Sequence, residues 1–154
     1  MLGVRIVKDK RLELAEPIVM KICGAIKELE RLGIQKVQFA LPHYIEWKVC
    51  KIMNLIQEKN PIREGYDAKD ERGKKFQIKY RTDDEDKSTG FGNIKFNKFD
   101  FLLCVFVNKE NFKIESIYKV PHDTVRKHTK EGYHSFRWNK ESRSDKTIER
   151  VFPS

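Results

Sequence analysis

Hydrophobic residues recur at helical spacing in residues 11–32, close to the start of the chain. Intervals of three to four residues place these positions on one face of a helix, which Gly33 ends. The apolar positions are Leu14, Ile18, Ile22, Ala25 and Leu29. Because Pro17 and Gly24 interrupt the segment, we expect either a late start of the helix or a kink in it.

A second helix is predicted over residues 42–57, with proline in its first turn and Asn60-Pro61 beyond its end. On a helical wheel the apolar arc consists of Ile45, Val49, Ile52, Met53 and Ile56. The opposite side carries Lys48, Lys51, Asn54 and Glu58. The pattern therefore predicts an amphipathic helix with one buried face.

After this helix the hydrophobic pattern changes to a period of two residues, which is typical of strands. Residues 66–70 and 74–82 are two such segments, and the intervening residues 71–73 predict a hairpin turn. The continuous apolar run at 99–107 predicts a central strand covered on both faces. Residues 112–120 predict a neighbouring strand.

The other segments are more polar or shorter. Residues 83–98 predict a mobile loop beside the sheet, a common place for substrate contacts. The tail predicts a short helix at 122–130, an aromatic segment at 135–138 and a last helix at 142–150. Together the elements predict an α/β fold in a single domain over residues 1–154.

The charge balance suggests a class of binding partner. The chain has 154 residues, with 32 Lys and Arg against 23 Asp and Glu, which gives a formal net charge of +9. A compact surface with this excess favours polyanions, nucleic acid first and an anionic membrane second. The longest apolar run, residues 101–107, is far shorter than the ~20 residues that cross a bilayer.

Cysteine usage and the first residues indicate a compartment. Cys23, Cys50 and Cys104 lie far apart in apolar surroundings, which predicts buried thiols rather than a disulfide framework or a zinc site. Residues 1–14 carry no pattern of an export signal, so we expect a cytoplasmic protein.

Candidate chemistry begins with the strand at 75–81. Its alternation directs one set of side chains to the face opposite the apolar one: Lys75, Gln77, Lys79 and Arg81. A half-buried strand with a solvated face explains this pattern without any function. However, Asp67 lies in the adjacent strand of the hairpin, and a short turn would bring its carboxylate beside Gln77 and Lys79.

Glu46 is the second candidate, at the margin of the apolar arc of the second helix between Met53 and Cys50. An ionised carboxylate there loses hydration unless a positive group meets it. Two explanations remain open: Glu46 reaches water or pairs with a lysine, or it is a metal ligand directed at the sheet.

These segments together resemble the PD-(D/E)XK, or restriction-endonuclease-like, nuclease superfamily. The residues that carry the resemblance are Glu46 in a helix, Gly65-Tyr66-Asp67-Ala68, and Phe76-Gln77-Ile78-Lys79-Tyr80-Arg81. More narrowly, the pattern is similar to small prokaryotic domains with a G-x-D-A strand and a Q-x-K-x-R strand. The resemblance covers about residues 40–120, so the helix at 11–32 and the basic tail at 121–154 lie outside it. The implied fold is a restriction-endonuclease-like core, a mixed β-sheet flanked by helices.

The resemblance also implies an activity, the metal-dependent hydrolysis of DNA phosphodiester bonds. Mg²⁺ or Mn²⁺ would be bound by the carboxylates of Glu46 and Asp67, the amide oxygen of Gln77 and the backbone carbonyl of Ile78. Lys79 would orient the attacking water and neutralise charge on the phosphorane. Gln77 departs from the usual Asp or Glu, which weakens the predicted metal site.

Basic side chains outside this site are predicted to contact nucleic acid: Arg81, Lys95, Lys98, Arg126, Lys127 and Arg137. In the tail they are interleaved with Tyr133, Phe136 and Trp138, as in a nucleic-acid groove. Packing of the three aromatic residues in the core explains the interleaving equally well.

Two other functions remain open. One is a non-catalytic nucleic-acid-binding module that retains the fold with a decayed site, and the other is a structural subunit whose basic face meets an acidic partner protein. Cleavage of both DNA strands needs two active sites, so the nuclease hypothesis is compatible with a homodimer.

Overall fold

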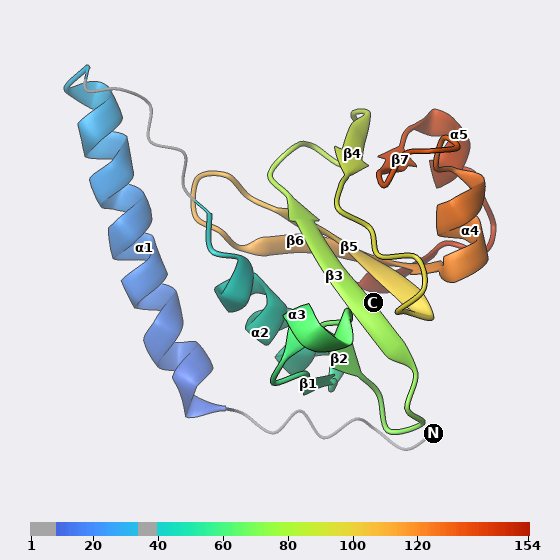
Figure 1. Cartoon of the computed structure of the whole chain (residues 1–154). Helices are drawn as coiled ribbons and strands as arrows, with labels where there is room; N and C mark the ends of the chain where they lie inside the picture. Colours follow the sequence, from blue (N-terminus) through green and yellow to red (C-terminus); the bar gives the residue numbers. More distant parts are fainter. Residues whose placement is uncertain (1–8, 34–39) are drawn as a thin grey trace.

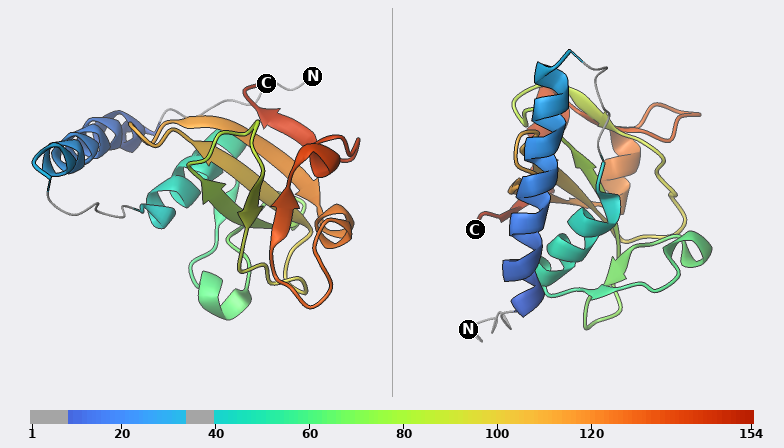
Figure 2. Two further views of the ribbon diagram at one scale, coloured as in Figure 1. Left: turned by 90° about the horizontal axis from the view of Figure 1, so that it is seen from above. Right: turned by 90° about the vertical axis from the view of Figure 1, so that its left-hand side faces the viewer.

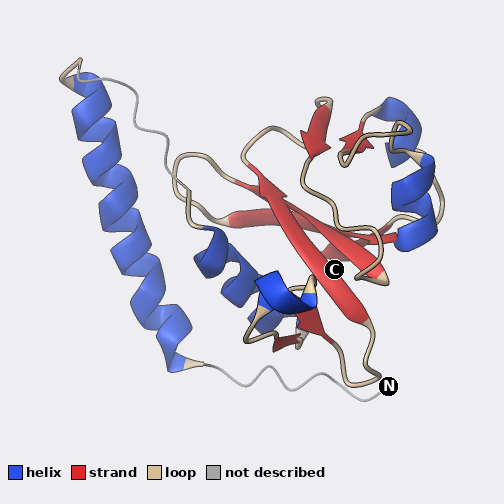
Figure 3. Ribbon diagram, viewed as in Figure 1, coloured by secondary structure: helices blue, strands red, loops and turns tan. Residues whose placement is uncertain are grey.

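A computed structural model describes residues 9–33 and 40–154 and contains a six-stranded sheet between helices (Figure 1). In spatial order the strands are β1 (Ile56–Gln57), β2 (Ala68–Lys69), β3 (Lys75–Arg81), β5 (Phe101–Val107), β6 (Ile114–Pro121) and β8 (Glu149–Phe152). β3 and β5 pair in parallel, whereas the other neighbours pair antiparallel. The predicted α/β fold with a mixed sheet flanked by helices is therefore confirmed (Figure 3).

β5 lies inside the sheet and is covered on both faces, as its apolar run predicts. On one face it contributes Leu103, Val105 and Val107 to a hydrophobic core. On the other face it contributes Leu102, Cys104 and Phe106 to a second core. Both sets are almost fully buried, so neither face leaves room for the polar alternation of an exposed strand.

Two helices cover the first face. α2 (Pro42–Met53) packs directly on it, and α1 (Lys10–Arg31) lies outside α2 at one end of the molecule (Figures 1 and 2). Val19 and Cys23 are the buried residues of α1. Lys48 of α2 is buried because its Nζ pairs with Glu16 Oε1 of α1 at 2.7 Å. Its predicted position on the solvent side of the helix was therefore wrong.

The second face is covered by the chain after β6 together with β4 (Thr89–Phe91). α4 (His122–Lys127) packs against it, and β4 pairs antiparallel with β7 (Phe136–Trp138) in a separate two-stranded sheet, followed by α5 (Lys140–Arg143). Phe136 and Trp138 are buried, so core packing explains these two aromatic residues, whereas Tyr133 is exposed.

The course of α1 differs from the sequence prediction. The helix begins at Lys10, where the Asp9 side chain caps it, and continues through Pro17, so the expected late start is wrong. The apolar stripe that indicates the helix is not the one that the fold buries, since Leu14 and Ile18 are 68% and 58% exposed. Residues one position further along, such as Val19, contact the core instead.

Several other boundaries were predicted wrongly. α2 ends at Met53 because Asn54 adopts a left-handed φ of 54°, and the chain then enters β1 instead of extending the helix to residue 57. The helix predicted at 142–150 is a single turn, α5, held by a capping box between Asn139 and Ser142. The chain after it pairs with β6 as β8. A short helix, α3 (Pro61–Glu64), was not predicted.

The three cysteines are free and buried, as predicted. In the described ranges, 9–33 and 40–154, no helix combines the length and hydrophobicity that a membrane span requires. Residues 1–8, on which the expectation of no export signal partly depends, lie outside the described residues.

Candidate active site

The candidate site lies where β2 diverges from β3. β2 pairs only with the first residues of β3, with Ala68 opposite Phe76. Beyond this point the carboxylate of Asp67 takes the place of a paired strand, because its Oδ2 accepts a hydrogen bond from the Ile78 amide at 2.7 Å. The N–H and C=O of a strand residue lie on the same edge. The Ile78 carbonyl is therefore directed toward the same corner as the Asp67 side chain.

Alternation along β3 separates the core side chains from the candidate ones. Phe76 and Ile78 belong to the core beneath α2. Gln77 and Lys79 consequently lie on the opposite face of the strand. Gln77 is buried, whereas Lys79 is partly exposed. Among the described residues none forms an ion pair with Lys79, so its ammonium group is free to meet a ligand.

Glu46 extends from α2 and is influenced by the charges of this corner. Its side chain is only 18% exposed. Burial and the nearby Asp67 charge raise the pKa of Glu46 to about 7, although His43 and Lys79 act in the opposite direction. His43 Nδ1 lies 3.9 Å from Glu46 Oε2. The helix thus presents a carboxylate that is costly to ionise without a further positive charge.

Asp67 is in a similar state. Burial raises its pKa, while the Ile78 amide, Lys79 and Lys95 favour the ionised form. Two carboxylates that repel each other therefore share one corner with Lys79 and Lys95, and the pKa of each is raised. Such perturbed groups are typical of sites that bind a ligand or carry out chemistry.

Gln77 has a role that the sequence did not predict. Its Nε2 donates to the backbone oxygens of Gly65 and Lys95, at 3.2 Å each, and its Oε1 accepts from the Lys95 amide at 3.4 Å. The side chain therefore fastens the segment before Asp67 to the loop after β4. Its predicted part as a metal ligand stays a prediction, and Oε1 has one lone pair left for it.

Gly65 makes a second connection between the same segments. Its φ of +77° is in the left-handed region. A Cβ built on Gly65 would lie 2.7 Å from Cγ of Lys98, so only glycine allows this approach. The glycine of the G-x-D-A segment thus brings the loop carrying Lys95 and Lys98 against the candidate site.

Three of the basic residues predicted to bind nucleic acid line one pocket: Lys95, Lys98 and Arg126. The pocket has a volume of about 910 Å³ and lies between residues 93–98 and the segment at 126–134. The other three lie elsewhere. Arg81 pairs with Asp83 at 2.9 Å, Lys127 pairs with Asp145 at 3.3 Å, and Arg137 is exposed on β7.

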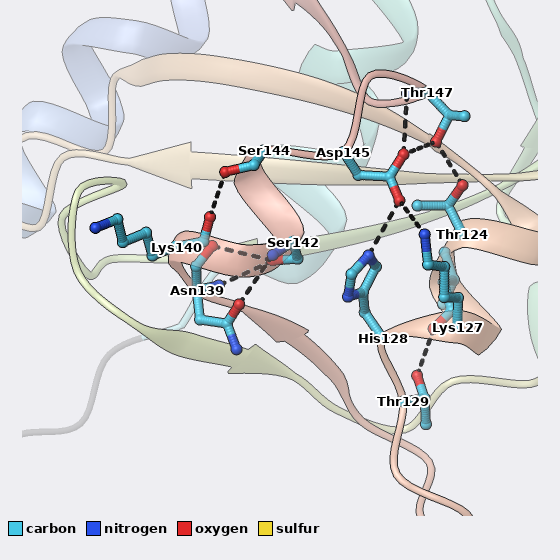
Figure 4. Close-up of polar contacts among 11 residues, drawn as sticks. Thr124, Lys127, His128, Thr129, Asn139, Lys140, Ser142, Ser144, Asp145 and Thr147 are labelled. Carbon is cyan, nitrogen blue, oxygen red and sulfur yellow. Dashed lines mark hydrogen bonds and ion pairs between the residues drawn. The ribbon is translucent and has the colours of Figure 1, made fainter.

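A polar cluster fixes the chain after α4 (Figure 4). Asp145 Oδ2 lies 3.1 Å from His128 Nε2 and accepts from Lys127 at 3.3 Å, while Oδ1 accepts from both the amide and the hydroxyl of Thr147. These contacts, those from Thr147 first, hold the pKa of Asp145 well below its usual range. The cluster joins the end of α4 to the segment before β8.

The donor atoms of the corner suit a hard divalent cation. Carboxylate oxygens of Glu46 and Asp67 and the carbonyl of Ile78 are the ligand types that Mg²⁺ and Mn²⁺ take, with water completing the shell. The described part of the chain contains no group of three His, Cys, Asp or Glu side chains that could hold a metal. A cation here would therefore depend on two carboxylates.

Comparisons of the sequence with protein-family models and with curated proteins find no match. Sequence reasoning missed three contributions to this region: His43 beside Glu46, the Lys98 stem against Gly65, and Phe96 in the pocket. The first had a signal, because residues three apart on a helix are neighbours. The other two depend on tertiary contacts.

Proposed function

We propose that the protein is a metal-dependent nuclease that acts on DNA, with its catalytic site at the corner of α2, β2 and β3. The observation that carries the proposal is the presence of two half-buried carboxylates, Glu46 and Asp67, near the ammonium of Lys79 at an open strand edge. The resemblance to the PD-(D/E)XK superfamily assigns the same residues to this chemistry.

Glu46, Asp67 and the Ile78 carbonyl would hold Mg²⁺ or Mn²⁺. A bound ion of this kind supplies Lewis acidity toward a phosphate oxygen and lowers the pKa of a bound water. It would also offset the burial that raises the pKa of both carboxylates and the Asp67 charge that raises the pKa of Glu46 further.

Lys79 has two tasks in the proposed reaction. Hydrolysis adds water across the P–O bond, with attack on phosphorus in line with the leaving oxygen. The ammonium group orients the attacking water and donates hydrogen bonds to the phosphoryl oxygens, where negative charge increases in the transition state. Lys95, whose charge also acts on Asp67, would contribute a positive charge for an adjacent phosphate.

A second candidate function is a non-catalytic nucleic-acid-binding module. The hydrogen bonds of Gln77 favour it, because they engage the amide where an active member of the superfamily would usually have a free acid. The net charge of +9 fits both functions.

Plasmid cleavage in Mg²⁺, Mn²⁺ and EDTA distinguishes the two. We expect nicking by the wild type with metal and none in EDTA. Lys79→Ala should reduce the rate by about 10²–10³, since one preorganised electrostatic donor is typically worth that much. Asp67→Asn should cause a similar loss, and its remaining oxygen can still accept from the Ile78 amide.

Lys109→Ala is the matched control. This lysine is exposed in the turn between β5 and β6, so its substitution removes the same charge at a place away from the site. Cleavage by Lys79→Ala at the wild-type rate would contradict the mechanism. DNA binding without cleavage by any variant on varied substrates would favour the binding module.

A further inference from the structure

The pocket beside the candidate site has the properties of a nucleobase site. Its volume of about 910 Å³ lies within the ~300–1,000 Å³ of cavities that hold small ligands. It lies between two loops and is thus a local depression, too small for the width of a duplex but large enough for one or two nucleotides.

The lining combines positive charge with aromatic rings. Lys95, Lys98, Arg126 and Lys130 contribute cations, and Glu131 is the acid among the lining residues. The rings are those of Phe96, Tyr133 and His134. Interleaved cations and rings are typical of surfaces that follow a single strand, with phosphates on the cations and bases stacked on the rings.

The positions of the rings support stacking. The Arg126 guanidinium lies over the ring of Phe96, 4.8 Å from its centroid, and this cation–π contact holds the planar cation at the pocket. Tyr133 is 58% exposed, with Lys130 Nζ 5.0 Å from its ring centroid. Lys130 lies over one face of this exposed ring, so a base would stack on the opposite face.

The pocket is connected to the candidate site through Lys95. Its backbone is hydrogen-bonded to Gln77, and its charge acts on Asp67. A strand with one nucleotide in the pocket would therefore bring a neighbouring phosphate to the corner of Glu46 and Asp67.

We infer that this pocket binds an unpaired base next to the phosphodiester that is cleaved, so that the substrate class is DNA with an unstacked nucleotide rather than a continuous duplex. The inference rests on the proposed function for the identity of the polymer. In a duplex the faces of the bases are stacked on one another and cannot reach Tyr133 or Phe96.

Fluorescence anisotropy in EDTA tests the inference without cleavage. The probes are a labelled oligothymidylate of roughly 12 nucleotides and an abasic sugar-phosphate oligomer of the same length and charge. We expect the wild type to bind the thymidylate at least about 5-fold more tightly, the lower limit for stacking on one aromatic side chain.

Tyr133→Ala should remove most of this preference and leave the affinity for the abasic oligomer unchanged, whereas Tyr133→Phe should retain it. Lys95→Ala should weaken binding of both oligomers. Equal affinity of the wild type for the two oligomers, or a preference unchanged in Tyr133→Ala, would overturn the inference. Because Tyr133 is exposed, its substitution leaves the core intact.

The binding assay and the plasmid assay can fail independently of each other. Base preference without metal-dependent cleavage would remove the nuclease proposal and keep the pocket. Cleavage that depends on Lys79 without base preference would keep the nuclease and remove the pocket.

Discussion

Two acid-centred clusters in this protein differ in how completely their carboxylates are paired. Asp145 accepts hydrogen bonds from Lys127 and Thr147 and contacts His128, and its pKa is lowered (Figure 4). In the corner of α2 and β3, Asp67 receives one amide hydrogen bond, Glu46 lies near His43, and the pKa of both carboxylates is raised.

The difference separates structural from functional charge. The Asp145 cluster supplies its own donors, so ionisation of this acid favours the folded state. The corner acids are held partly buried with too little positive charge, so their ionisation opposes folding. Such a pair of acids is typical of a binding site that a ligand completes, where a loss of stability accompanies function.

The largest loss of stability is expected for Asp145→Ala. It leaves His128 and the Thr147 amide without their acceptor, and we expect the melting temperature to fall on the order of 10 °C. Asp123→Ala is the control, because it removes an exposed acid from the neighbouring α4. At a temperature where the variant is fully folded, its rate of DNA cleavage should equal that of the wild type. A loss of cleavage by the folded variant would give Asp145 a functional role and contradict the distinction between the two clusters.

Glu46→Gln should act in the opposite direction. With a pKa raised from 4.5 to about 7, the folded state binds this proton more tightly than the unfolded state. The contribution of Glu46 to stability is therefore greatest below pH 4.5 and falls as the pH rises to 7, by at most about 3 kcal/mol, since one pKa unit corresponds to ~1.4 kcal/mol. The variant should be more stable than the wild type at pH 8 and equal to it at pH 4.

Denaturant unfolding across this pH range measures the effect in EDTA. Asp67, whose pKa is also raised, should leave a smaller slope of the same sign in the variant. A wild-type stability that rises between pH 4.5 and 7 relative to Glu46→Gln would show that Glu46 has partners that favour its charge.

Gly65→Ala sharpens the comparison through the loop that approaches the corner. Gly65 and Gly73 have nearly the same left-handed φ, +77° and +78°, but only the Cβ at Gly65 would meet Lys98. Both variants should lose about 1 kcal/mol from the backbone. The steric contact should add about 1 kcal/mol at Gly65 and reduce cleavage, measured by unfolding and plasmid nicking. Equal effects at both positions would mean that the Lys98 contact is unimportant.

The sequence predicted the parts of the fold that local pattern controls. The apolar run of β5 and the alternation of β3 were sufficient to place both strands. The segment at 149–152 was predicted as helix because its strand state depends on pairing with β6, which no local pattern contains. Lys48 was placed on the wrong side because its partner, Glu16, lies in another helix.

The candidate site was predictable to a similar extent. Strand alternation was sufficient to put Gln77 and Lys79 on one face, and hairpin length to bring Asp67 near them. The hydrogen bonds of Gln77 could not be predicted, since both partners, Gly65 and Lys95, come from loops whose course depends on the whole fold.

Mn²⁺ binding at pH 7.5, measured by electron paramagnetic resonance, tests most directly whether Glu46 and Asp67 bind a cation. The account predicts that the wild type binds Mn²⁺ and that the double variant Glu46→Gln, Asp67→Asn does not, while Asp123→Ala binds as the wild type does. It also predicts that Mn²⁺ raises the melting temperature of the wild type and not that of the double variant. No binding by the wild type, or equal binding by the double variant, would contradict the account.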